Sequence, residues 1–287
     1  GVLDMKGMTA LETMTLIQLK RLGVPLRRDI ILLAVADEEV DSGGIDAIVK
    51  IWNEVDCSHS INEGGYGLQD IFLEGQVLHA ISVAEKGAVW MKMIASGPPG
   101  HGSTPVPGRA PEHLSNALAK LAERKDKVVW APALLESFRR MGKEKGGMTG
   151  AILQSPGLFK LLLKGRLMKN PVMHAALTNT VNVTGFFGGE QPNVVPSEVG
   201  AILDCRILPG HTAESLVAEL TALVDDPAIR FEITSSTNAN ESPWEDRFFA
   251  ALAERAVEGQ EHAVAGPVVS VGYTDSQALR PLGVKAY

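Results

Sequence analysis

Apolar and polar positions in the first part of the chain follow patterns that predict helices and strands in turn. In residues 8–22 apolar side chains recur three or four positions apart, and Gly23 follows as a stop signal. Residues 44–55 have the same helical period. Between these helices, residues 30–35 (IILLAV) form a continuous apolar run, which is typical of a strand buried on both faces of a parallel sheet. With a short strand candidate at residues 59–62, this succession predicts an α/β domain.

From about residue 85 the pattern changes. The expected elements are a strand at 88–95, a helix at 111–124, strands at 181–187 and 199–207, a helix at 212–224 and a strand at 229–234. The order β-α-β-β-α-β is that of the ferredoxin-like split unit. A stretch rich in Met, Lys and Leu, residues 125–178, interrupts this unit as an insertion.

The alternation of helix and strand then returns, with a helix at 246–257 and a strand at 268–271. We therefore expect an α/β domain made of residues 1–86 and 238–287, with an α+β domain of residues 87–237 inserted between its two parts. Ligand sites in open α/β sheets lie beyond the carboxyl ends of the strands. Polar residues at such places are thus the first candidates for chemistry.

The composition argues against some classes of partner. The chain has 287 residues and a net charge of −7, whereas a nucleic-acid-binding protein would favour a basic face. The longest apolar run, residues 30–36, is far shorter than the ~20 residues that span a bilayer, so we expect no membrane partner. The two cysteines lie far apart and form no metal knuckle, and we expect a reducing, cytoplasmic location. Because the first residues resemble the interior of a domain, we expect the N-terminus to be missing, which leaves export open.

Carboxylates stand at three places where a strand is expected to end. Asp4 precedes a helix, and alone it is typical of a helix cap. Glu38 and Glu39 follow the 30–35 run and repel each other, which a solvated loop tolerates. Around a cation, however, one carboxylate can bind the metal while the other takes a proton from a metal-bound water. Glu63 precedes two glycines that permit a sharp turn, and an exposed turn residue is the alternative.

The order of these motifs, D-M-K-G, strand-D-E-E and strand-x-E-G-G, resembles the zinc-dependent aminoacylase/carboxypeptidase family. This family includes acetylornithine deacetylase, succinyl-diaminopimelate desuccinylase, glutamate carboxypeptidase and carboxypeptidase S. The resemblance implies a zinc-exopeptidase-like catalytic domain with an inserted ferredoxin-like lid or dimerisation domain. It implies that Asp4 bridges two zinc ions, with cobalt or manganese as alternatives, and that Glu38 is the general base. Glu39 would ligate one zinc and Glu63 the other.

Motifs after residue 87 resemble the same family. His101, in G-H-G-S, resembles the lid histidine that polarises the scissile carbonyl, and a surface histidine is the alternative. Asn193, in Q-P-N-V-V-P, and Arg206, in D-C-R, resemble the family's asparagine turn and its arginine for the substrate carboxylate. The alternatives are a turn former and a partner for the preceding aspartate. Thr274 and Ser276, in G-Y-T-D-S, resemble a substrate-contact turn, and a helix N-cap is the alternative.

The resemblance implies hydrolysis of an amide bond in N-acyl amino acids or short peptides with a free carboxylate. It also implies a homodimer joined through residues 87–237, with His101 acting in the partner subunit's site. The family's two metal-binding histidines have no counterpart among the seven histidines here, and His59, the nearest in sequence to a ligand, is better explained as a surface strand residue. We therefore expect a chain truncated at both ends that holds zinc poorly. The alternative is a catalytically silent dimerisation or binding module.

Overall fold

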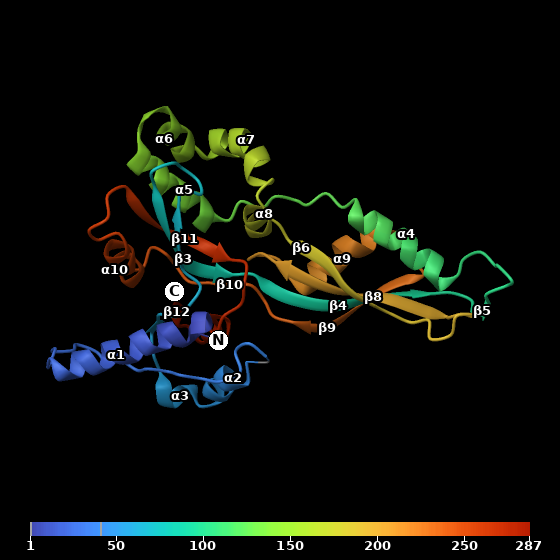
Figure 1. Ribbon diagram of the computed structural model, residues 1–287, viewed down its shortest axis with the longest axis horizontal. Helices are drawn as coiled ribbons and strands as arrows, with labels where there is room; N and C mark the ends of the chain where they lie inside the picture. Colours follow the sequence, from blue (N-terminus) through green and yellow to red (C-terminus); the bar gives the residue numbers. More distant parts are fainter. Residues whose placement is uncertain (1, 41) are drawn as a thin grey trace. The chain divides into compact units, whose positions relative to one another are not determined.

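The structure, a computed structural model, describes residues 2–40 and 42–287. The chain divides into two compact units, Gly1–Asp56 and Cys57–Tyr287, which we call the N-terminal unit and the main unit. Each unit is described by itself, and Figure 1 labels the helices and strands of both.

The N-terminal unit is helical. A π-helical turn, η1 (Val2–Lys6), leads into α1 (Gly7–Arg21), and α2 (Gly43–Lys50) and α3 (Trp52–Val55) follow. These helices confirm the two that apolar spacing predicts, with the second one broken at Ile51.

Residues 30–35 do not form the expected buried strand, so this prediction was wrong. They are irregular chain, and Ile30 and Ile31 are exposed. A parallel strand needs neighbouring strands that pair with its N–H and C=O groups. Within residues 2–40 and 42–56 the structure has no strand that could supply these partners. The apolar run indicates a tendency to be buried, but it does not specify a pairing partner.

The main unit contains a mixed sheet built around β3 (Val77–Glu85). β3 pairs in parallel with β11 (Ala263–Ser270). It also pairs antiparallel with β2 (Tyr66–Gln69) and β10 (Asn240–Glu241). Strands from both ends of the main unit therefore share one sheet, as a split α/β domain requires.

Two smaller elements complete this part. β1 (His59–Ser60) pairs in parallel with β12 (Lys285–Ala286), which confirms the short strand expected after residue 58. α10 (Arg247–Ala256) packs against β11 and β3 and buries Phe249 in the core.

The insertion forms four helices, and the first of them packs on this mixed sheet. They are α5 (Pro132–Lys145), α6 (Gly147–Gln154), α7 (Pro156–Leu167) and α8 (Pro171–Leu177). α5 packs on β11 (Figure 1). Phe138 and Phe159 of the insertion share a core with Leu78 of β3. Gly266 of β11 permits the close approach, because a Cβ there would lie 2.2 Å from Ser137 Oγ. None of the helices in residues 2–40 and 42–287 combines the length and apolar character needed to cross a membrane.

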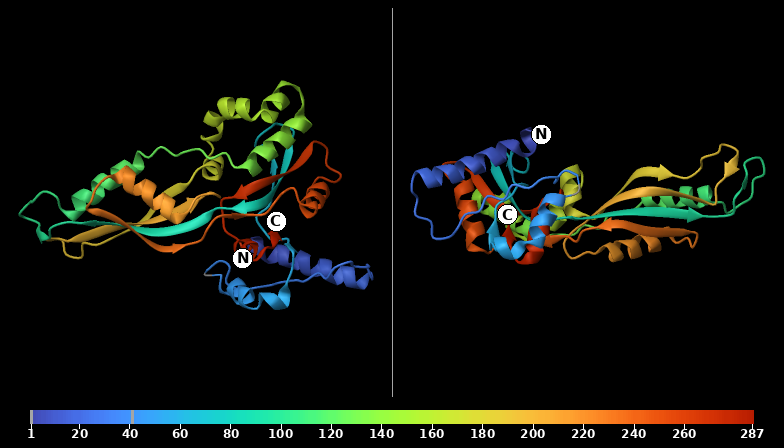
Figure 2. Two further views of the ribbon diagram at one scale, coloured as in Figure 1. Left: turned by 180° about the vertical axis from the view of Figure 1, so that it is seen from behind. Right: turned by 90° about the horizontal axis from the view of Figure 1, so that it is seen from below.

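The ferredoxin-like unit expected from the sequence is confirmed, and we call it the lid. Its elements are β4 (Gly87–Ser96), α4 (Ala110–Ala122), β6 (Thr180–Phe187), β8 (Glu198–Ile207), α9 (Ala213–Val224) and β9 (Ile229–Ser236). The antiparallel sheet has the order β6-β8-β4-β9, and both helices share its core on one face. Figure 2 shows β4 running on from the end of β3 to the far end of the lid.

Candidate active site

The predicted site residues are distributed over both units. Asp4 lies in η1, and Glu38 and Glu39 lie in a turn before α2. In this turn the N–H groups of residues 40 and 42 donate to the carbonyl of Asp37, at 3.2 and 2.8 Å. Gly44 allows the turn to close, because a Cβ there would lie 2.2 Å from the carbonyl oxygen of Ala36. The turn thus gives the two neighbouring glutamates a defined local backbone.

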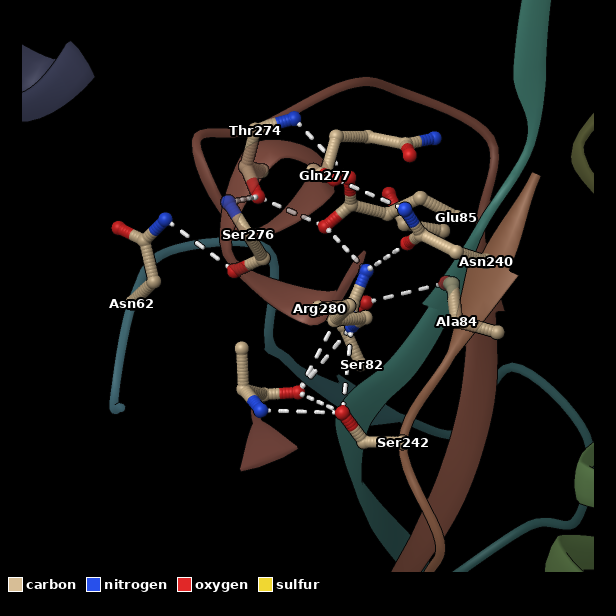
Figure 3. A network of polar contacts seen from close by, with 12 residues as sticks. Asn62, Ser82, Ala84, Glu85, Asn240, Ser242, Thr274, Ser276, Gln277 and Arg280 are labelled. Atoms are coloured by element: carbon tan, nitrogen blue, oxygen red, sulfur yellow. Dashed lines mark hydrogen bonds and ion pairs between the residues drawn. The ribbon is translucent and has the colours of Figure 1, made fainter. Parts of the chain in front are cut away.

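In the main unit, the turn that contains Glu63 lies against the turn that contains Thr274 and Ser276. Asn62 Nδ2 donates to Ser276 Oγ at 3.3 Å (Figure 3). A Cβ on Gly64 would lie 3.7 Å from Thr274 Cγ2, so the backbone here passes close to the threonine. The structure therefore brings together two turns that the sequence places more than two hundred positions apart.

Thr274 is held by a buried carboxylate that sequence reasoning missed. Its hydroxyl donates to Glu85 Oε1 at 2.7 Å and its backbone N–H donates to Glu85 Oε2 at 3.2 Å. The same hydroxyl oxygen accepts the N–H of Ser276 at 3.2 Å, at the start of α11 (Ser276–Leu279). Burial raises the pKa of Glu85, while the charge of Arg280 and the hydrogen bonds from Thr274 oppose this rise.

Arg280 neutralises Glu85 and joins several segments beneath this turn. Its Nη1 lies 3.2 Å from Glu85 Oε1 and donates to Asn240 Oδ1 at 3.2 Å. Its Nε donates to Ser242 Oγ at 3.3 Å, and its Nη2 donates to the Ala286 carbonyl at 3.3 Å. Figure 3 shows Glu85 of β3, Asn240 of β10 and Ser242 gathered around the one guanidinium. The Thr274 turn therefore rests on a satisfied polar network, which we call the Glu85–Arg280 network.

Lys86 follows Glu85 and is also buried. Its Nζ donates to the carbonyls of Ala175 and Thr178, at 2.9 and 2.8 Å, and to Thr180 Oγ1 at 3.3 Å. Burial, with a smaller contribution from nearby Arg206, lowers the pKa of Lys86 to about 7. This lysine ties the start of the lid to the end of the insertion.

Arg206 lies near the same end of the lid. In β8 it is paired with Ala88 of β4 and with Thr180 of β6. Its Nε and Nη2 donate to the carboxylate of Asp204 at 2.8 and 3.1 Å, and its guanidinium lies 5.4 Å from the Trp90 ring centroid. The partnership with Asp204 is thus present, and the binding of a substrate carboxylate by Arg206 stays a prediction.

His101 and Asn193 meet in loops beyond the opposite end of the lid sheet. β5 (Gly100–His101) pairs with β7 (Val194–Val195), and the carbonyl of Asn193 accepts the N–H of Gly102 at 2.8 Å. His101 Nδ1 accepts the backbone N–H of Ser103 at 3.2 Å. Because a backbone N–H can only donate, the neutral ring must carry its proton on Nε2. His101 therefore presents an N–H donor on the side of the ring away from Ser103.

His101 and Arg206 lie too far apart to contact one small substrate within one subunit. Arg206 pairs with Ala88 at the start of β4, whereas Glu198 pairs with Ser96 at its end. From Ala88 to Ser96, β4 extends about 27 Å at ~3.4 Å per residue. His101 lies beyond Ser96, so the lid sheet separates it from Arg206 and from the Thr274 turn.

The donors present do not by themselves fit a zinc ion. In the part of the chain that the structure describes, no group of three or more His, Cys, Asp and Glu side chains is placed to hold a metal. Asp4, Glu39 and Glu63 offer only carboxylate oxygens, a set that suits Mg²⁺, Mn²⁺ or Ca²⁺ better than zinc. His59 is a structural residue: its Nε2 lies 3.2 Å from Asp246 Oδ1, and its ring packs on Phe248.

Comparison with known proteins decides the family. The model of the M20 peptidase dimerisation domain matches residues 83–232, which is more than half of the chain. The chain belongs to the M20 peptidase family. The family resemblance of the sequence motifs is thereby confirmed, and so is the presence of the family's dimerisation domain.

Known M20 proteins resemble the chain over most of its length. The chain is 25% identical over 297 residues to human N-fatty-acyl-amino acid synthase/hydrolase PM20D1, a match that covers 100% of this chain and 59% of that protein. It is 22% identical over 298 residues to rat aminoacylase-1A, covering 100% of this chain and 61% of that protein. The M20 family metallo-carboxypeptidase Sso-CP2 from Sulfolobus solfataricus has a similar fold, with a TM-score of 0.51, 20% identity and coverage of 84% of this chain and 57% of that one. The chain thus spans about three fifths of the length of these relatives.

Proposed function

We propose that the protein hydrolyses an amide bond in N-acyl amino acids or short peptides that carry a free carboxylate. The observation that carries this proposal is the match of this whole chain to about three fifths of an N-fatty-acyl-amino acid synthase/hydrolase, together with its M20 dimerisation domain. The chain's own geometry supports it, because the Glu63 turn and the Thr274 turn meet above a rigid polar network.

Each residue has a separate task in the proposed reaction. Glu38 takes a proton from the attacking water, whose oxygen bonds to the carbonyl carbon, and delivers that proton to the leaving amine as the C–N bond breaks. His101 donates its Nε2–H to the oxyanion of the tetrahedral intermediate. Arg206 binds the substrate carboxylate by charge-assisted hydrogen bonds. These roles use only side chains of this protein.

The metal requirement is a separate part of the proposal. The family resemblance implies two zinc ions bound in part by Asp4, Glu39 and Glu63, whereas these three residues alone make an oxygen-only set. We therefore expect the 287-residue chain to hold zinc weakly. Elemental analysis that found two tightly held zinc ions per chain would contradict this expectation.

The test is a hydrolysis panel on a version of the protein extended to the length of its relatives. N-acyl amino acids and dipeptides of the same residue would be compared, with and without added zinc, because this comparison separates a deacylase from a peptidase. Glu38→Gln should lower turnover by roughly 10²–10⁴ while metal content is retained, whereas Glu39→Gln should lower metal content as well. A zinc-loaded, folded protein that hydrolyses none of these substrates would instead support a silent dimerisation or binding module.

A further inference from the structure

The helix α7 has two apolar stripes, and only one of them faces the core. Phe159, Leu163 and Leu167 recur four positions apart; Phe159 and Leu167 are buried in the core, and Leu163 packs against it. This stripe accounts for the attachment of α7 to the rest of the main unit. The second stripe is made of leucines that point away from the first.

The second stripe is exposed. Leu158, Leu161 and Leu162 are spaced i, i+3 and i+4, which puts them on one face of the helix. Their exposed fractions are 48%, 78% and 55%. A globular helix normally has polar residues on the face opposite its buried stripe. An exposed apolar face such as this one is typical of an interaction surface.

Basic side chains border the exposed stripe on both sides. Lys164 lies three positions after Leu161, and Arg166 lies four positions after Leu162, so the two cations flank the leucines. The whole stretch from Lys145 to Gly189 contains no Asp or Glu, although the chain has a net charge of −7. The charge is therefore segregated along the chain, and this segment is cationic in an otherwise acidic protein.

We infer that this face of α7, the leucine stripe with its basic flanks, docks on an anionic lipid surface. A helix with this composition lies in the plane of a membrane interface, with its apolar side chains at the headgroup boundary and its cations among the headgroups. A symmetric pairing of two such faces in a dimer is a poorer alternative, because it would place two cationic faces against each other. This mode of binding needs no membrane-spanning run, so the short apolar runs of the sequence do not argue against it. The inference therefore replaces the expectation from the sequence that the chain has no membrane partner.

The test measures co-sedimentation of the chain with vesicles of phosphatidylcholine that contain phosphatidylserine, and with vesicles of phosphatidylcholine alone. Binding should require phosphatidylserine and should weaken as salt is added. Leu161→Ser/Leu162→Ser should weaken binding at least about tenfold, since each leucine loses an apolar contact. Lys164→Glu/Arg166→Glu should weaken it by a similar factor or more.

Matched variants separate docking through α7 from the effects of losing an exposed apolar side chain or positive charge anywhere on the surface. Val106→Ser changes a side chain of comparable exposure, 46%, in the lid, and Lys125→Glu/Lys127→Glu makes the same charge change elsewhere. Both should bind vesicles like the unmodified chain. Because the altered positions are exposed, the variants should keep the thermal unfolding curve of the parent, and Lys125→Glu/Lys127→Glu should lose only the weak surface ion pair of Lys127 with Glu219. In addition, the emission of Leu161→Trp should shift to the blue on vesicles, and that of Val106→Trp should not.

Three results would overturn the inference. The first is no binding to the anionic vesicles, or equal binding after the leucine substitutions. The second is a salt-sensitive interaction with polyglutamate that is as strong as vesicle binding and indifferent to the leucines, which would assign the face to an acidic polypeptide. The third is a dimer, seen by analytical ultracentrifugation, that dissociates in Leu161→Ser/Leu162→Ser, which would place a second copy on the stripe. The inference is independent of the proposed hydrolysis.

Discussion

Glu85 and Arg280 form a buried ion pair, 3.2 Å apart, at the end of the central strand of the main sheet. Two charges removed from water are tolerated only when their remaining hydrogen-bonding groups are satisfied. Here Thr274 bonds both oxygens of the carboxylate, and Asn240 and Ser242 bond the guanidinium. The pair therefore couples the stability of the sheet to the position of the turn that we expect to contact substrate.

Removing one member of this pair should be costly. Arg280→Met leaves the carboxylate of Glu85 buried without its counter-charge, so the free energy of unfolding should fall by about 3–5 kcal/mol. Urea denaturation of the 287-residue chain measures this change. Arg255→Met is the matched control, because Arg255 pairs with Glu258 on the surface, and its loss should cost less than about 1 kcal/mol. Similar losses for both variants would show that the buried ion pair contributes no more to the free energy of unfolding than a surface pair does.

The lid could be predicted from the sequence because its strands and helices have clear periods in the expected order. The family could be recognised because its short motifs stand in the expected order along the chain. The central strand β3 was missed, since His79, Ser82 and Glu85 interrupt its apolar pattern. The signal that could have found the Glu85–Arg280 network was the charged pair Glu85-Lys86 set between two apolar segments. Its partner Arg280 could not have been identified, because tertiary pairing over such a separation has no local signature.

Residues 30–35 are the opposite case, in which a strong local signal does not form the expected element. The apolar run satisfies the composition of a buried strand, but a strand depends on hydrogen bonds from neighbours that lie elsewhere in the chain. The site residues Asp4, Glu38 and Glu39 belong to this same unit. Their predicted roles therefore rest on motif resemblance, whereas the contact between the Glu63 and Thr274 turns rests on geometry.

The stability of the protein should depend on the charge of Lys86. Burial lowers its pKa from 10.5 to about 7, so the folded state disfavours the charged lysine. Below about pH 7 both states carry the charge and the penalty is complete. Between about pH 7 and pH 10.5 the unfolded state binds more protons, so the free energy of unfolding should rise, by at most ~1.4 kcal/mol per pH unit.

Comparison with Lys86→Met isolates this contribution. The variant leaves the carbonyls of Ala175 and Thr178 without their donor, which is a constant cost, but it removes the titration. The free energy of unfolding of the parent should therefore rise relative to that of Lys86→Met as the pH increases from 7 to 10. Lys125→Met, at an exposed position, should show a constant difference. A constant difference for Lys86→Met too would mean that the buried lysine keeps its ordinary pKa.

Arg206 should distinguish substrates by their charge. In the extended protein, Arg206→Ala should lower kcat/KM for substrates with a free carboxylate by about 10–100-fold, the value of one charge-assisted interaction. The corresponding amides or esters should be much less affected, because they cannot form this ion pair. Equal losses for both types would mean that Arg206 serves only as the partner of Asp204, with which it already forms two hydrogen bonds.

His101 should act in the active site of the partner subunit. Within one chain the lid sheet separates His101 from Arg206, because they lie beyond opposite ends of paired strands. A small substrate bound by Arg206 can therefore receive the Nε2–H of a His101 only from a second chain. The M20 dimerisation domain supports the required homodimer, in which each lid reaches the other subunit.

Subunit exchange tests this arrangement. In the extended protein, His101→Ala and Glu38→Gln should each be inactive alone. When equal amounts are mixed and exchanged at random, half of the dimers contain one subunit of each kind, and each such dimer has one site with both groups intact. Activity should therefore return to about a quarter of the parent value. His101→Ala mixed with a His101→Ala/Glu38→Gln double variant is the control and should stay inactive. If exchange is demonstrated by mass and activity does not return, His101 serves its own subunit or has no part in catalysis. The reason is that the site that keeps Glu38 in a mixed dimer belongs to the chain without His101, so only the other chain can supply the histidine.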